Sequence, residues 1–112
     1  MTLLATQNIV RTGLTPAYTA GTGSDTFLPD ANTFLHVKNA GGSPDVCAMA
    51  VLQGSAPGFT YSANSVSVTN AQERMIGPLP ANFFADPTTG LATVTHSFTT
   101  SVTSGVFKLT QP

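Results

Sequence analysis

The stretch Thr33-Phe-Leu-His-Val-Lys38 decides the fold class, because apolar and polar side chains alternate along it. Successive side chains of an extended strand point to opposite faces of a sheet. Leu35 and Val37 therefore share one face, which we expect in the core, and Phe34 and His36 share the other. This period of two residues predicts a β-strand rather than a helix.

The same alternation recurs along the chain. Ser65-Val-Ser-Val-Thr69 places two valines inward and three hydroxyl side chains outward, as in an antiparallel strand with one wet face. The near-continuous apolar run 46–52 indicates a strand covered on both faces, in the middle of a sandwich or under a partner subunit. The expected strands are residues 7–12, 33–38, 46–53, 65–69, 73–76, 91–98 and 106–110. We predict an all-β fold: a single-domain antiparallel β-sandwich or β-barrel, jelly-roll-like, spanning residues 1–112.

The breaks between these strands carry turn residues. Asn39–Asp45 contains two glycines and a proline, so we expect the strand ending at Lys38 to turn back as a hairpin into the strand beginning at Val46. Residues 16–25 are small, polar and glycine-rich, which indicates an exposed loop. Residues 77–87 are too rich in proline for a regular strand, yet they hold Leu79 and two phenylalanines. We expect this segment to dock on the chain's own sheets or on a neighbour.

The composition favours assembly over chemistry. The 112 residues include only four Lys or Arg and five Asp or Glu, with a net charge of −1, whereas Ser and Thr supply roughly a quarter of the chain. We therefore expect neither nucleic acid nor a membrane as partner, because no strong field attracts phosphates. Such a weakly charged surface favours association. Residues 1–8 lack an export signal, which predicts a protein made in the cytosol.

Candidate catalytic and metal-ligating residues are few. Cys47 lies in an apolar run, where we expect a buried thiol that acts as a small hydrophobe. His36 and His96 lack acidic or cysteine neighbours at ligand spacing, so we expect both on strand surfaces. Four of the five carboxylates are near predicted turns, where Asp bonds to backbone amides. We predict no enzyme, no metal site and no cofactor.

Candidate interface residues lie in two places. Residues 1–9 are apolar and β-prone, and we expect an extended N-terminal arm over residues 1–8 that adds to a sheet edge of a partner protein. Arg74 adjoins the segment 77–86 and is a candidate for a buried or interfacial ion pair, with a surface arginine as the alternative. The predicted contact residues are Leu3, Leu4, Ile9, Arg74, Leu79, Phe83 and Phe84.

Three stretches carry a resemblance to a known family: Ala5–Leu14, Thr33–Asn39 and Glu73–Pro80, the last followed by Phe83 or Phe84 and a turn at Gly90. Together they resemble small all-β virion proteins of tailed phages and prophages, particularly those of actinobacteria. The resemblance implies a structural virion protein, a decoration or minor capsid protein bound to the outside of the shell. Its partners would be the major capsid protein and further copies of the chain, with a homotrimer favoured.

Two other functions stay open. One is a head-tail joining or tail-tube component of the virion. The other is a carbohydrate-binding module for host attachment, although such modules need exposed aromatic platforms, and this chain has no Trp and only Tyr18 and Tyr61.

Overall fold

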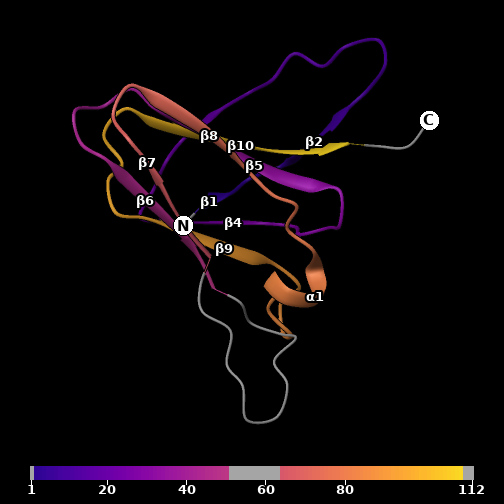
Figure 1. Cartoon of the computed structure of the whole chain (residues 1–112). Helices are drawn as coiled ribbons and strands as arrows, with labels where there is room; N and C mark the ends of the chain where they lie inside the picture. The colour runs from indigo at the N-terminus through magenta and orange to yellow at the C-terminus, as the bar shows by residue number, and fades with distance from the viewer. Residues whose placement is uncertain (1, 51–63, 110–112) are drawn as a thin grey trace.

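Two β-sheets packed face to face make up the computed structural model, which describes residues 2–50 and 64–109 (Figure 1). The described strands are β1 (Thr2–Leu3), β2 (Thr6–Ile9), β3 (Thr19–Ala20), β4 (Ser24–Phe27), β5 (Thr33–Asn39), β6 (Asp45–Met49), β7 (Asn64–Val68), β8 (Gln72–Ile76), β9 (Ala92–His96) and β10 (Val102–Leu109). A single helical turn, α1 (Ala81–Phe84), lies beside β9. The all-β prediction is confirmed, and the arrangement is a sandwich rather than a closed barrel.

The strand order defines the two layers. Sheet A runs β1-β4-β9-β6-β7, and sheet B runs β2-β10-β5-β8 with β3 also beside β10. The sheets are mixed, not purely antiparallel as expected, because β1 pairs parallel with β4 and β2 pairs parallel with β10. All other named pairings of the described strands are antiparallel.

The N-terminal residues are extended, as predicted, but they do not form a free arm. β1 joins the edge of sheet A and β2 joins the edge of sheet B, so residues 2–9 step from one sheet to the other. Between them, the Leu4 amide donates to the Thr26 carbonyl at 2.7 Å, and the Leu4 side chain is buried in the core. The segment therefore covers two sheet edges of its own chain.

The alternation in β5 places the core where it was expected. Leu35 and Val37 are fully buried on the inner face of sheet B. Val106 on the neighbouring β10 pairs with Leu35 and is also fully buried. From sheet A, Phe27 and Val94 belong to the same cluster of buried side chains. This shared apolar layer holds the two sheets together.

The predicted hairpin between β5 and β6 is wrong. β5 is bonded to β10 and β8 in sheet B, whereas β6 is bonded to β9 and β7 in sheet A. The loop after β5 therefore crosses from one sheet to the other. The buried Asn39 side chain anchors this loop, because its Nδ2 donates to the carbonyls of Ser43 (2.8 Å) and Val68 (3.0 Å).

β6 is covered on one face only. Cys47 and Met49 are fully buried, but Val46 is 42% exposed. Within the single chain, the expectation of a strand covered on both faces is wrong. An apolar side chain such as Val46 was taken as a sign of burial, but it lies on the exposed face of β6. Cover by a partner subunit stays a prediction, and residues 51–53 lie outside the described part of the chain.

The segment read as an exposed loop holds two strands, β3 and β4. In β4, Asp25, Thr26 and Phe27 are all buried. The sequence pattern failed here because polar side chains occupy inward positions, where hydrogen bonds satisfy them. The Thr22 hydroxyl, for example, donates to Asp25 Oδ1 at 2.5 Å.

The proline-rich segment docks on the chain's own sandwich, one of the two expected outcomes. Leu79 and Phe84 are buried in the core, and Phe83 packs against it. The Leu79 amide donates to the Thr33 carbonyl at 3.0 Å, and the Gly77–Pro78 peptide is cis. The following turn ends as predicted at Gly90, whose φ of 75° suits glycine. No helix in the described ranges has the length and apolarity needed to span a bilayer.

Candidate functional site

The outer face of sheet B carries an aromatic cluster. Phe34 and His36 on β5 point away from the core, beside Phe107 on β10. The Phe34 and Phe107 rings stack with centroids 5.8 Å apart, and Tyr18 meets the His36 ring edge-on at 5.4 Å. The Lys38 ammonium lies 4.0 Å from the centre of the Tyr18 ring. Tyr18 thus packs the segment before β3 onto the sheet.

His36 is buried, so its predicted place on a strand surface is wrong. Its face of β5 is the outer one, as expected, but the Tyr18 side chain covers the ring. The Tyr18 hydroxyl lies 2.8 Å from His36 Nδ1, and His36 Nε2 lies 3.2 Å from Glu73 Oε1. The Glu73 side chain is 60% exposed, so this pair sits at the surface.

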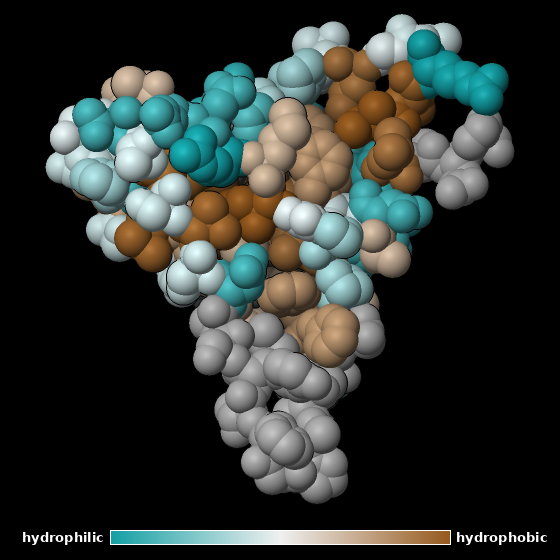
Figure 2. All heavy atoms as spheres, viewed as in Figure 1, coloured by the Kyte–Doolittle hydropathy of each residue, from teal (hydrophilic) through white to brown (hydrophobic). Residues whose placement is uncertain are grey.

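Two adjoining apolar grooves run beside the aromatic cluster, with volumes of about 340 and 300 Å³. They share Phe34 and Met75 as lining residues. We call their apolar lining the sheet B apolar face; it consists of Ile9, Val10, Leu14, Pro16, Phe34, Met75, Pro78, Phe107 and Leu109. Met75 is 68% exposed and Leu109 59%. Figure 2 shows hydrophobic atoms gathered near the end of β2 and the loop that follows it.

The predicted contact residues separate into two groups, four that lie in or against the core and three near the surface. Leu4, Leu79 and Phe84 are buried in the chain's own core, and Phe83 packs partly buried against it. These side chains hold the fold together, which removes them from the surface. The core position of Leu4 was not foreseen, whereas docking of the segment 77–87 on the chain's own sheets was one of the two expected outcomes.

The other three predicted contact residues stay near the surface. Leu3 on β1 is 63% exposed, and Ile9 on β2 lines one of the grooves. Arg74 on β8 is exposed and donates to the Glu73 carbonyl and to Gln72 Oε1, each at 3.1 Å. Within the chain Arg74 is therefore a surface arginine rather than a member of a buried ion pair.

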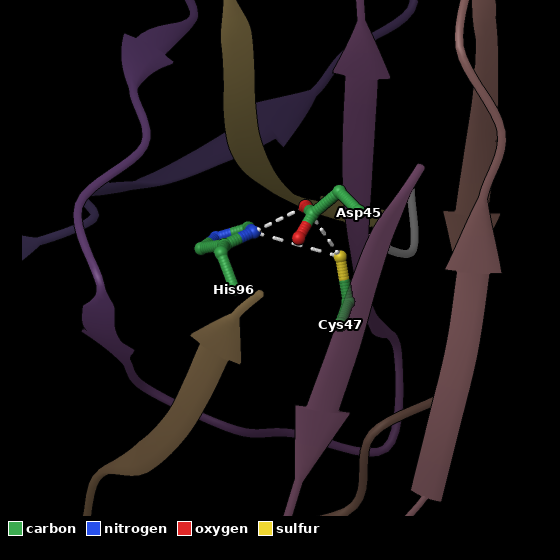
Figure 3. Close-up of side chains that lie close together, drawn as sticks. All are labelled: Asp45, Cys47 and His96. Atoms are coloured by element: carbon green, nitrogen blue, oxygen red, sulfur yellow. Dashed lines mark hydrogen bonds and ion pairs between the residues drawn. The ribbon is translucent and has the colours of Figure 1, made fainter. Parts of the chain in front are cut away.

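A buried polar cluster lies on the inner face of sheet A. Asp45 and Cys47 are two residues apart on β6, and the strand pairing places His96, at the end of β9, opposite Cys47. Their side chains point toward one another (Figure 3). His96 Nδ1 lies 2.7 Å from Asp45 Oδ2, the Cys47 thiol donates to the same oxygen at 3.2 Å, and Cys47 Sγ lies 3.6 Å from His96 Nδ1.

A second carboxylate reaches the far side of the His96 ring. Asp25 Oδ2 lies 3.4 Å from His96 Nε2, which is within ion-pair range but lacks the geometry of a hydrogen bond. The side chains of His96, Asp25 and Asp45 are all inaccessible to solvent. The Asp25 carboxylate is held by the Thr22 hydroxyl and, at 3.3 Å, by the Thr22 amide. Three strands, β4, β6 and β9, thus converge on one imidazole.

The chemistry of the cluster follows from its burial. Cys47 is buried as predicted, but its neighbours are polar rather than purely apolar. Desolvation raises the pKa of the Cys47 thiol, and the neighbouring Asp45 carboxylate raises it further. A protonated, enclosed thiol is a poor nucleophile. The predicted surface position of His96 is wrong, because pairing with β6 and β4 encloses the ring.

Sequence reasoning missed this cluster because its members are far apart in the chain. Asp45 and His96 are separated by 51 positions. The one usable signal was the Asp45-x-Cys47 spacing, which puts both side chains on the same face of a strand. Asp25 was hidden in a segment read as a loop.

Comparison with known proteins finds no family model, no curated protein and no solved structure that matches this chain.

Proposed function

We propose that the chain is a noncatalytic structural virion protein that binds the outside of a phage capsid and stabilises the shell. The observation that carries the proposal is the sheet B apolar face. Met75, Leu109 and Val10 are 68%, 59% and 46% exposed there, next to grooves that a partner's side chains would fill. Contiguous exposed apolar surface is typical of protein interaction sites.

The scarcity of charge supports the same role. Moving an unpaired charge from water into a protein interior or interface costs on the order of several kcal/mol. Only nine of the 112 residues are Lys, Arg, Asp or Glu, so few charges would be left unpaired at an interface. A capsid lattice repeats each contact many times, so avidity strengthens a small contact surface. The resemblance to phage virion proteins supplies the partner, the major capsid protein.

A homotrimer on the capsid exterior is part of the proposal. Closed rotational symmetry lets one surface patch serve every subunit of the oligomer. The carbohydrate-binding alternative is less well supported, because Tyr18 is half-buried against His36 and Phe107 rather than exposed as a platform. Tyr61 lies outside the described residues.

The experiment compares two surface variants of the full chain for binding to expanded capsids by co-sedimentation. Met75→Lys/Leu109→Lys places two charges on the sheet B apolar face. Leu28→Lys is the matched control, because Leu28 is 58% exposed and lines neither groove. We expect capsid binding to fall at least tenfold in the double variant and to stay near the original level in the control.

Equal binding by both variants would contradict the proposed contact surface. Failure of the unmodified chain to bind any capsid, with ring-shaped hexamers in negative-stain images, would favour the head-tail joining or tail-tube role. Removal of residues 1–8 would not test an arm contact alone, because β1 and part of β2 belong to the sandwich.

A further inference from the structure

We propose that Asp45 Oδ2, Cys47 Sγ and His96 Nδ1 form a structural Zn²⁺ site in the core of the sandwich. These three ligand atoms lie within 4.8 Å of one another, and all three residues are buried. Imidazole nitrogen, thiolate sulfur and carboxylate oxygen are the donors that zinc takes in proteins. The site is independent of the proposed capsid contact, which lies on the other sheet.

The spacing of the ligand atoms suits one small ion. With zinc–ligand bonds of about 2.0–2.3 Å, ligand atoms of a tetrahedral site are roughly 3.4–3.6 Å apart. The Cys47 Sγ to His96 Nδ1 distance is 3.6 Å and the Cys47 Sγ to Asp45 Oδ2 distance is 3.2 Å. The Cys47 Sγ to Asp45 Oδ2 distance must widen slightly, and the 2.7 Å separation of His96 Nδ1 and Asp45 Oδ2 must widen more. Strand pairing of β6 with β9 already brings the three side chains together.

The surroundings of the other His96 ring nitrogen also support a metal site, because Asp25 faces it. A metal-bound histidine usually donates its other ring N–H to a carboxylate, which fixes the tautomer and the ring orientation. His96 Nε2 is fully buried, has no hydrogen bond, and faces Asp25 Oδ2 at 3.4 Å. With Nδ1 bound to the ion, Nε2 carries a proton and donates a hydrogen bond to the Asp25 carboxylate. The amide of Phe98 likewise holds the other oxygen of Asp45 at 3.2 Å.

The ligand charges suit a divalent ion. Zn²⁺ displaces the proton of the Cys47 thiol, so that a thiolate, the Nδ1 atom of a neutral imidazole and the Asp45 carboxylate surround the ion. The ligand charges then cancel the charge of the zinc ion. The described residues supply three ligands to the ion. Because the side chains are closed to solvent, substrate has no access, and the site stabilises the fold instead.

The test begins with metal content and stability of the full chain. Protein unfolded in denaturant with EDTA is refolded with or without one equivalent of Zn²⁺, desalted, and measured by mass spectrometry of metals and by thermal unfolding. We expect one zinc per chain and a rise in Tm on the order of 10 °C, since binding to the native state alone shifts the unfolding equilibrium. Zinc-free protein with an unchanged Tm would overturn the proposal.

Cobalt substitution identifies the ligands. Co²⁺ at the site should show visible tetrahedral bands and a near-ultraviolet thiolate-to-cobalt charge-transfer band. Cys47→Ser should lose the charge-transfer band, whereas His36→Gln, the matched control at the other buried histidine, should keep it. Asp25→Asn should keep the band but bind zinc about 10- to 100-fold more weakly in competition with a chelator.

Metal retained without a charge-transfer band, or retained equally by Cys47→Ser and the control, would mean adventitious surface binding and would overturn the proposal. If Cys47→Ser does not fold, the cobalt spectrum of the unmodified chain decides: absence of the charge-transfer band refutes the site.

Discussion

The two histidines lie on strands of opposite sheets, and both are buried, yet their surroundings differ. His96 on β9 lies between two carboxylates, with no solvent access to any of the three side chains. His36 on β5 is capped by the Tyr18 hydroxyl and pairs with a carboxylate that is 60% exposed. The first is part of the core, and the second fastens a surface segment. Neighbours distant in sequence, rather than the strand itself, set the role of each residue.

The largest effect should come from removing the His96 ring. His96→Gln in the presence of EDTA takes the imidazole away from two buried carboxylates, and we expect a loss of about 3–5 kcal/mol in the free energy of unfolding. His36→Gln should cost about 1–2 kcal/mol, because only a partly exposed network is broken. Urea denaturation measures both. Equal losses would show that burial alone, and not the paired carboxylates, sets the contribution of each histidine.

A smaller effect should follow from Tyr18→Phe. The ring stays packed on His36 and Phe107, but the hydroxyl contact to His36 Nδ1 is lost. We expect about 0.5–1.5 kcal/mol of destabilisation. Hydrogen exchange should become faster in residues 10–20 while the rates in β9 stay the same. Faster exchange in β9 would mean that the two histidine regions are coupled.

Glu73→Gln should have less effect still. The exposed His36–Glu73 pair is expected to contribute about 0–1 kcal/mol, and added salt should reduce it further. Urea denaturation at low and high ionic strength makes this measurement. A loss above 2 kcal/mol would place the His36 network in the same class as the His96 cluster.

The smallest effect is expected at Asp30. It is a pH dependence of stability that involves neither histidine. Its hydrogen bond from the Asn32 amide, together with the Lys108 ammonium, lowers its pKa below the ordinary 3.8. The folded state therefore binds the proton less tightly than the unfolded chain does. Its contribution to stability is present above pH 3.8 and is lost as the pH falls through the lower folded pKa. NMR titration measures this pKa, and a value at or above 3.8 would contradict the assigned bonds.

The predictable part of the fold is the part in which one strand face is apolar and the other polar. Leu35, Val37 and Val68 were recognised in this way, and each is fully buried. β4 was missed because its inward Asp25 looks like a loop residue. Its burial is explained by the Thr22 hydrogen bonds and by the His96 ring that faces its carboxylate. The β5–β6 hairpin was mispredicted because turn residues indicate a change of direction but not which sheet the next strand joins.

The candidate sites were less predictable than the fold. Exposed apolar residues such as Met75 and Leu109 belong to one surface only after β8, β5, β10 and β2 are placed side by side. The buried cluster needs β4, β9 and β6 side by side before Asp25, His96 and the two β6 side chains meet. Local pattern fixes which face a side chain takes, whereas contact across strands depends on topology.

The most direct test of the proposed role is a cryo-electron microscopy reconstruction of expanded capsids incubated with the full chain. We expect density on the capsid exterior, with Met75 and Leu109 of the sheet B apolar face buried against the shell or a sister subunit. Saturated capsids in which that face points into solvent would contradict it, as would capsids with no added density.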